Sequence, residues 1–307
     1  MRASRDLGGA TAGPVALTIG NFDGVHRGHQ AMLTRLVEAA ADLDLAPAVL
    51  TFDPHPREFF AAAAAPPRLS VLRSKLEVFR LFGVAQVWVA RFDANLAALS
   101  AEAFVHDVLE GALGVRWVLV GEDFRFGEGR RGDLDLLRAR PRAFTVEAMR
   151  TVSVDGERAS STAIRQALAA GELERAAALL GRSYTISGHV AHGRKLGRNL
   201  GFPTANLPLR HRPPLSGIFT VRVHGLPGGP HAGVASIGVR PTLEAGGDPV
   251  LEVFLLDFEQ SIYGRRITVE FLSKLREEAS YPDLDALARQ IGTDVERARE
   301  YFASQPS

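Results

Sequence analysis

Residues 21–29, NFDGVHRGH, separate an apolar run at 15–20 from a segment with the spacing of an amphipathic helix. A buried strand, a glycine turn and a helix in this order form the first repeat of a parallel α/β sheet. Gly20 and Gly24 allow the backbone to turn tightly and to approach a ligand closely. A helix that begins near Gly28 would point its free N–H groups at the same place, so the stretch predicts an anion site.

Two histidines, His26 and His29, stand at the start of this predicted helix. Imidazoles at that point could neutralise charge on a departing phosphate. Two histidines on one turn also occur in zinc sites, but the chain has no cysteine and no third ligand close by in the sequence. The phosphate interpretation is favoured, and a metal pair or purely structural histidines remain as alternatives.

The first half of the chain repeats this strand-and-helix pattern. Further strands are expected at 46–52, 86–92, 117–121 and 144–149, and apolar residues at helical spacing lie between them at 33–40 and 72–79. The pattern predicts an α/β fold with a doubly wound parallel sheet that has helices on both faces. Sheets of this kind bind ligands at the carboxyl ends of their strands, which is where NFDGVHRGH lies.

The second half has a different pattern. Two helices are expected at Ser161–Ala170 and Leu173–Leu180, and then short strands follow one another without helices: YTISGHV, GIFTVRVHG, HAGVASIGV, LEVFLLDF and RRITVEFL. This spacing predicts an antiparallel β-barrel, and a terminal helix is expected at about 284–302. The predicted domains are therefore 1–182 and 183–307.

Composition excludes several classes of protein. The 307 residues are 46% hydrophobic and carry a net charge of +1, which is typical of a folded globular protein without a basic surface for nucleic acid. No apolar run approaches the roughly 18 residues of a membrane span. We therefore expect a cytoplasmic monomer or weak homo-oligomer that binds neither nucleic acid nor membrane.

The most unusual stretch of the second half is HGRKLGRNLGFPTANL at 192–207. Its glycines and its proline predict a loop rather than a strand. Thr204 and Asn206 would alternate along an extended chain, and their side-chain oxygens suit Mg²⁺. The alternative is a turn in which these side chains bond only to the local backbone.

The motifs of the first half resemble a known family. GNFDGVHRGH resembles the signature of nucleotidyltransferases and, more narrowly, of the bacterial bifunctional riboflavin kinase/FAD synthetase family. TFDPHPREFF, VGEDFRFGEGRRGD and SSTAIRQAL follow in that family's order. The resemblance implies that His26 and His29 lie on the ATP phosphates. It also implies nucleotide contacts from the loop around them and from a mobile loop that closes on the nucleotide: Gly20, Phe22, Asp23, Gly24, Ser161, Thr162 and Arg165.

Three further residues of the first half are candidate flavin contacts. The resemblance makes Asp123 a contact to ligand or metal, whereas the residues alone also allow a solvated loop acid. Phe126 and Phe59 could stack on a flat ring, although phenylalanines are more often core residues.

The motifs of the second half resemble riboflavin kinases. GFPTAN matches their signature without substitution, and GIFTVRV, ASIGVRPT, LEVFLLDF, IYG and FLSKLREE follow in order. The resemblance implies that Thr204 and Asn206 hold a magnesium–nucleotide next to Gly201, and that Glu252 removes the proton from the riboflavin 5′-hydroxyl. Arg276 would neighbour the flavin or nucleotide, or else form a surface ion pair with Glu277 or Glu278.

Strand alternation leaves the orientation of Glu252 open. Glu252 shares a face with Phe254 and Leu256, and that face either lines a cavity or points outward while Leu251, Val253 and Leu255 fill the core. A carboxylate in a cavity would make a good general base.

The resemblance as a whole implies a bifunctional enzyme of flavin cofactor synthesis. The barrel would make FMN from riboflavin and ATP with Mg²⁺, and the α/β domain would join FMN to AMP, giving FAD and pyrophosphate. Two alternatives differ in class: a non-catalytic protein that senses flavin or nucleotide, and an enzyme with only one of the two activities.

Overall fold

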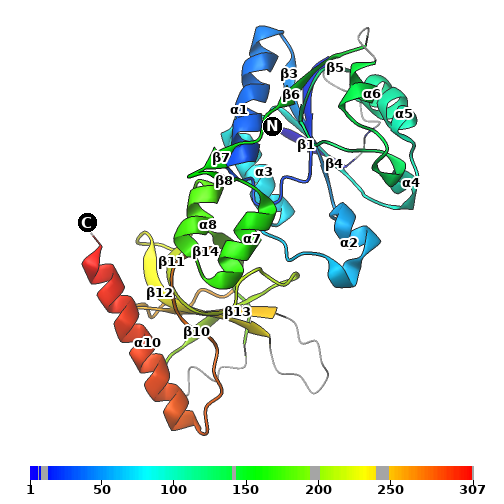
Figure 1. Ribbon diagram of the computed structural model, residues 1–307. Coiled ribbons are helices and arrows are strands. Elements are labelled where there is room, and N and C mark those ends of the chain that lie inside the picture. Colours follow the sequence, from blue (N-terminus) through cyan, green and yellow to red (C-terminus); the bar gives the residue numbers. More distant parts are fainter. Residues whose placement is uncertain (6, 8–12, 140–142, 194–200, 240–248, 306–307) are drawn as a thin grey trace. The chain divides into compact units, whose positions relative to one another are not determined.

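The computed structural model describes residues 1–307 except 6, 8–12, 140–142, 194–200, 240–248 and 306–307. The chain forms two compact units. One consists of Met1–Pro66 with Ser70–Ser160, and the other of Pro67–Leu69 with Ser161–Ser307. In Figure 1 the first unit runs from blue to green and the second from green to red.

The first unit contains a parallel sheet. Among the described residues its order is β1-β4-β3-β2-β5-β6. The strands are β1 (Arg2–Ser4), β2 (Val15–Ile19), β3 (Ala46–Phe52), β4 (Gln86–Ala90), β5 (Val115–Gly121) and β6 (Thr145–Met149). The order reverses at β2, because β3 lies on one side of it and β5 on the other. Open α/β sheets bind ligands at such a switch point, and the predicted doubly wound sheet is confirmed.

Helices cover both faces of this sheet, and a small hairpin follows it. The elements are α1 (Arg27–Asp42), α2 (Pro56–Phe60), η1 (Ala62–Ala64), α3 (Leu72–Leu81), α4 (Ala94–Ala97), α5 (Ala101–Ala103), the π-helix η2 (Phe104–Ala112), η3 (Glu128–Arg130), α6 (Leu134–Arg138), β7 (Ser153–Val154) and β8 (Glu157–Arg158). Side chains alternate along β2, so Ala16 packs in a cluster with residues of α1 and α3, whereas Leu17 packs in a cluster with residues of η2 and α6.

The second unit contains an antiparallel sheet with the order β10-β13-β12-β11-β14-β9 in the described part of the chain. The strands are β9 (Thr185–His189), β10 (Thr204–Pro208), β11 (Gly217–His224), β12 (His231–Val239), β13 (Pro249–Leu255) and β14 (Arg266–Arg276). A bridge between Ala191 and Asn206 joins the two edges, so the sheet closes almost completely and the predicted barrel is confirmed. The prediction of a loop up to residue 207 was wrong at its end, because pairing with β13 makes residues 204–208 a strand.

The helices of the second unit are α7 (Ser161–Ala170), α8 (Leu173–Leu180) and α10 (Leu284–Ser304). The two predicted helices before the barrel have the predicted bounds, and the terminal helix is confirmed. Val295 and Ala298 of α10 pack against Ile218 and Val234 on the outer face of the barrel sheet. The sheet therefore has apolar side chains on both of its faces.

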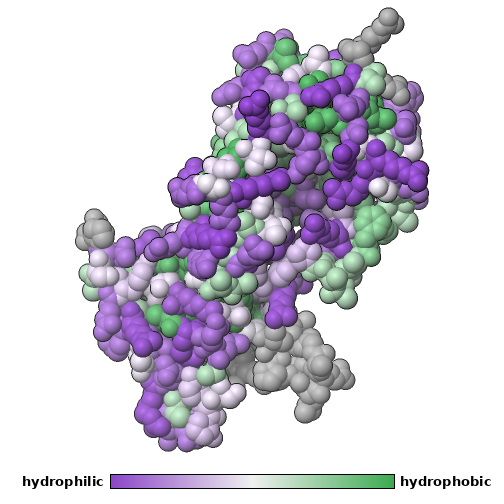
Figure 2. Space-filling view, viewed as in Figure 1, coloured by the Kyte–Doolittle hydropathy of each residue, from purple (hydrophilic) through white to green (hydrophobic). Residues whose placement is uncertain are grey.

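The surface is mostly hydrophilic on the face that Figure 2 shows. An apolar group covers the region of α2 in the first unit. Phe59 and Phe60 of this helix are 40% and 68% exposed. Among the described residues, no helix has the length and hydropathy that crossing a membrane requires.

Candidate active sites

The loop between β2 and α1 brings the two histidines together. His26 is the N-cap of α1, and its Nδ1 accepts the backbone N–H of His29 at 3.4 Å. The two rings stack with their centroids 3.7 Å apart. Both imidazoles therefore lie at the N-terminus of a 16-residue helix, at the carboxyl end of the strand where the sheet order reverses.

His29 is the more perturbed of the pair. Burial, then the charges of His26 and Lys75, hold the pKa of its imidazole well below the usual 6.5, so the ring is neutral at physiological pH. Its Nδ1 is buried and has no hydrogen-bond partner in the described part of the chain. The described residues contain no group of three His, Cys, Asp or Glu that could hold a metal ion. A neutral imidazole with an unused nitrogen suits a phosphate ligand.

The other predicted nucleotide contacts of this loop are two glycines, which offer backbone groups, and two residues whose side chains are buried. Gly24 adopts a φ of 81°, which favours glycine, and Gly20 donates its backbone N–H to Leu50. The Phe22 side chain is fully buried and contacts Phe79 edge-on at 5.2 Å, so the prediction holds at most for its backbone. Asp23 is 5% exposed, and its carboxylate accepts hydrogen bonds from Ser70.

Three predicted flavin contacts lie in different surroundings. Asp123 follows β5, the neighbour of β2, and the Arg158 guanidinium at 2.6 Å lowers the pKa of its carboxyl. Phe126 is buried against Phe104 and Phe124, so the structure gives it a packing role instead of a free ring face. Phe59 is exposed and belongs to an aromatic group with Phe60 and Phe92.

Ser161, Thr162 and Arg165 lie in the first turns of α7, where the resemblance implied a loop. The segment is helical because Ala163, Ile164, Ala167 and Leu168 form a buried apolar stripe at helical spacing. The Nε atom of Arg165 donates to the Pro67 carbonyl at 2.7 Å within the second unit.

In the second unit, strand register brings the predicted kinase residues onto one row. Paired positions across five strands are Asn206, Glu252, Ser236, Ile218 and Arg276. Directly paired residues share a face of the sheet, so Asn206 and Glu252 lie side by side. Thr204 is the diagonal neighbour of Glu252 on the same face, at a Cα separation of about 7–8 Å.

The structure decides which face holds Glu252. Leu251, Val253 and Leu255 are at most 6% exposed and fill the barrel interior. Glu252 is half-buried on the opposite face, next to Phe254, which packs in the apolar cluster beneath α10. The carboxylate therefore lies at the margin of an apolar surface and not on an open one.

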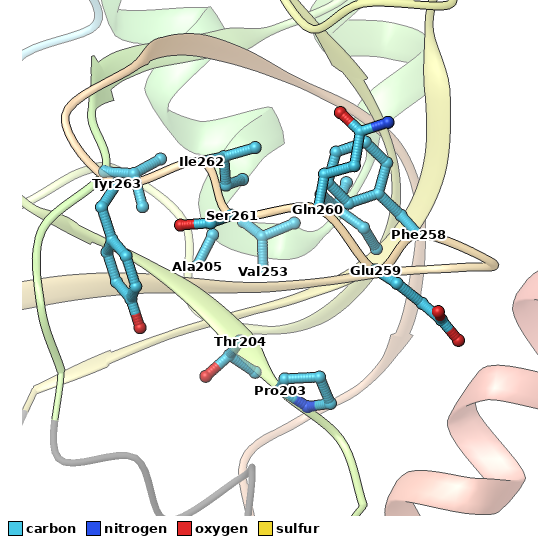
Figure 3. A pocket seen from close by; sticks show the side chains of 12 residues that line it. Pro203, Thr204, Ala205, Val253, Phe258, Glu259, Gln260, Ser261, Ile262 and Tyr263 are labelled. Atoms are coloured by element: carbon cyan, nitrogen blue, oxygen red, sulfur yellow. The ribbon is translucent and has the colours of Figure 1, made fainter.

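A cavity of about 190 Å³ lies beside Thr204. Figure 3 shows Pro203 and Thr204 together with the segment that carries Phe258, Gln260 and Tyr263. This segment was not among the predicted site residues, although the IYG motif at 262–264 was the signal that could have found it. Gly201, which lies shortly before the strand β10 that carries Thr204, adopts a φ of 86°.

Arg276 forms a buried ion pair that sequence analysis missed. Its Nε and Nη2 atoms donate to the Asp294 carboxylate of α10 at 2.7–3.0 Å, and Asp294 is 1% exposed. The alternative of an ion pair with Glu277 or Glu278 was wrong, because the Arg276 guanidinium pairs with Asp294 and bonds to Glu277 through that residue's backbone carbonyl. Arg276 therefore fastens α10 to the face that carries Glu252.

Asp294→Ala is expected to destabilise the second unit by about 3–5 kcal/mol, because it leaves a largely buried guanidinium unpaired. Urea unfolding followed by circular dichroism measures this loss. Both tryptophans, Trp88 and Trp117, lie in the first unit, so tryptophan fluorescence is the internal control and stays unchanged. The matched variant Asp257→Ala breaks an exposed ion pair with Arg299 and should barely change stability. Equal effects of the two variants would contradict the role of the buried pair.

Two family models match the chain. Residues 10–163 match the model described as FAD synthetase, and residues 180–302 match the model described as riboflavin kinase.

Similar proteins cover nearly the whole chain. A bifunctional riboflavin kinase/FMN adenylyltransferase of Pseudomonas fluorescens is 49% identical over 289 residues, which are 93% of this chain and 92% of that protein. The protein of the same description from Escherichia coli K12 is 46% identical over 305 residues, or 98% and 97% of the two chains. A crystal structure titled as a macrolide-efflux protein from Streptococcus pneumoniae is 28% identical, with a TM-score of 0.81 over 97% of this chain and 98% of that one. We take only the fold from the last match.

Proposed function

Because the chain belongs to the bifunctional riboflavin kinase/FMN adenylyltransferases, we propose that the two reactions divide between residues 1–182 and 183–307, although the two compact units divide between Ser160 and Ser161. The chain phosphorylates riboflavin to FMN with ATP and adenylylates FMN to FAD with release of pyrophosphate. In our proposal the barrel half carries the first reaction and the parallel-sheet half carries the second.

The stacked pair of His26 and His29 carries the proposal for adenylyl transfer. An oxygen of the FMN phosphate attacks the α-phosphorus of ATP, and the bond to pyrophosphate breaks. The neutral His29 donates a hydrogen bond to the charge that develops on the phosphates, and the N-terminus of α1 adds its dipole. The backbone from Gly20 to Gly24 is proposed to bind the nucleotide, and Ser161, Thr162 and Arg165 of α7 stay predicted nucleotide contacts on the resemblance alone.

The shared face of Thr204, Asn206 and Glu252 supports the proposal for the kinase. Glu252 takes the proton of the riboflavin 5′-hydroxyl while the oxygen attacks the γ-phosphorus, and ADP leaves. The cavity beside Thr204 is also lined by Val253 and Leu255, whose side chains point away from the face of Glu252, so it would hold a part of the nucleotide remote from the reacting phosphorus. The exposed ring of Tyr263 offers a face for stacking there, and Gln260 offers donors and acceptors.

Mg²⁺ fits the donor set of this face. The Thr204 hydroxyl and the Asn206 amide oxygen are neutral hard ligands, and they would hold the ion together with phosphate oxygens and water. The ion supplies neutralisation of phosphate charge when it is bound.

The flavin contacts of the first unit are proposed for Asp123 and Phe59, which remain accessible. The protein's partners would be riboflavin, FMN, FAD and ATP, handled in the cytoplasm by a monomer or weak homo-oligomer. Incubating the full chain with riboflavin, ATP and Mg²⁺, followed by chromatography of the flavins, tests the function. FMN should appear first and FAD later, and the lack of either product would refute the corresponding half.

Gly193→Ala is expected to lower FMN formation by about 10- to 100-fold. A Cβ at this position would overlap the Asn206 amide, which would then have to leave its place beside Glu252. Conversion of supplied FMN to FAD should be unchanged. The matched control is Gly292→Ala, since a methyl group there meets nothing within 4 Å and the residue lies in the middle of α10. A wild-type rate of FMN formation in Gly193→Ala would exclude Asn206 from the kinase site.

A further inference from the structure

Lys75 is unusual for this chain. Of the 36 lysine and arginine residues only Lys75, Lys195 and Lys274 are lysines. Lys75 is also buried, with 7% of its surface exposed, although it belongs to the short surface helix α3. A buried ammonium is unfavourable unless polar groups accept its hydrogen bonds, so the groups around Lys75 must compensate for its burial.

The Lys75 ammonium holds the loop that carries the histidines. Its Nζ atom donates to the backbone carbonyl of Asn21 at 3.1 Å. Ser70, just before the same helix, holds the next residues, since its N–H and hydroxyl donate to Asp23 Oδ1 at 3.0 and 3.2 Å. The hydroxyl oxygen of Ser70 also accepts the N–H of Gly24 at 2.9 Å.

This loop needs such restraint because its backbone is strained. Phe22 and Val25 adopt φ values of 50° and 41°, a region that bulky and β-branched residues rarely enter. Strained backbone of this kind persists only where the surrounding structure fixes it. His26 follows directly, and its position decides where the stacked His29 ring lies.

Two buried polar atoms, one of this loop and one of the helix that follows it, have no hydrogen-bond partner among the described residues. They are Asn21 Oδ1, on the residue whose carbonyl Lys75 holds, and His29 Nδ1. Buried polar atoms are normally hydrogen-bonded, so His29 Nδ1 is available to donate to an acceptor such as a phosphate oxygen of a bound nucleotide. The Lys75 charge acts on the same imidazole, together with His26.

We propose that Lys75 is a positioning residue for adenylyl transfer, whose ammonium fixes the Asn21 carbonyl and thereby places His29 against the nucleotide phosphates. The inference rests on the proposed role of His29. Lysine ends in a compact ammonium and arginine in a larger planar guanidinium, so the two residues are not interchangeable at this buried position.

Three variants of the full chain separate the charge of Lys75 from its shape. Lys75→Met should lower kcat for FAD formation by about 10- to 100-fold, with a smaller change in the KM for ATP. Its acid limb in the pH–rate profile should move to higher pH, because loss of a positive neighbour raises the pKa of His29. Lys75→Arg keeps the charge, so kcat should fall while the acid limb stays in place. Ser70→Ala also leaves the ammonium and should lower kcat without moving the limb.

The controls use the same protein. Riboflavin phosphorylation should be unchanged in all three variants, and tryptophan fluorescence reports whether the first unit is folded. Arg73→Met removes an exposed cation from the same helix and should have wild-type kinetics. Wild-type FAD formation in Lys75→Met, or a lower kcat with an unmoved acid limb, would overturn the inference. If His29→Ala were also fully active, the proposed function itself would have failed.

Discussion

Replacing His29 by alanine is expected to lower FAD formation from FMN and ATP by about 10²- to 10³-fold. The imidazole is neutral and half-buried, and it is stacked on His26 at the N-terminus of α1. A hydrogen-bond donor fixed in such a place stabilises charge that develops only in the transition state, so its loss reduces kcat most. Riboflavin phosphorylation does not use this residue, and FMN should accumulate.

The assay follows all three flavins by chromatography in one reaction that starts from riboflavin. The control is His106→Ala, since the His106 side chain is 72% exposed on η2 and pairs with the neighbouring Asp107. This variant should produce FAD at the wild-type rate. FAD formation by folded His29→Ala within a few-fold of wild type would show that the histidine pair does not act on the phosphates.

Glu252→Gln is expected to lower FMN formation by about 10²- to 10⁴-fold, because glutamine keeps the shape of the side chain but cannot accept the hydroxyl proton. The variant should still convert supplied FMN to FAD at the wild-type rate. Initial rates measured with riboflavin and, separately, with FMN as substrate give the rate of FMN formation and the rate of FAD formation for the same preparation.

A second carboxylate makes the comparison sharper. Glu278 lies near Ser236, the cross-strand partner of Glu252, and burial raises the pKa of its carboxyl. If Glu252 is the base, Glu278→Gln should retain FMN formation within several-fold. If Glu278→Gln lowered FMN formation more than Glu252→Gln, Glu278 would be the general base. If a folded Glu252→Gln variant lost both FMN and FAD formation, Glu252 would not be the specific base of the kinase.

Local patterns predicted most of the fold. The strand at Ala46–Phe52 and the helices at Ser161–Ala170 and Leu173–Leu180 have the predicted bounds, because their apolar spacing matches their period over their whole length. Most of the elements that were not predicted are short or depend on a partner, whereas the nine-residue π-helix η2 was missed although it is neither. Strand β1 has three residues and exists through its pairing with β4, and β10 exists through its pairing with β13.

Motif resemblance named the residue types of both sites but not their surroundings. It could not show that the rings of Phe22 and Phe126 are buried, since a phenylalanine in a glycine-rich loop can face either way. It also missed Ser70 and Lys75, which contact the histidine loop from 47 and 54 residues away. Such contacts follow from how α3 packs on the sheet, and no short motif contains both partners.

The sequence by itself determined the two-part architecture, the position of each motif at a strand or helix end, and the residue types that carry the chemistry. These follow from hydrophobic period, glycine placement and motif order, which are local properties of the chain. Only the tertiary structure decided the face on which Glu252 lies, the buried partner of Arg276 and the lysine behind the histidine loop. Strand register and helix packing set these contacts, and both depend on residues that are far apart in sequence.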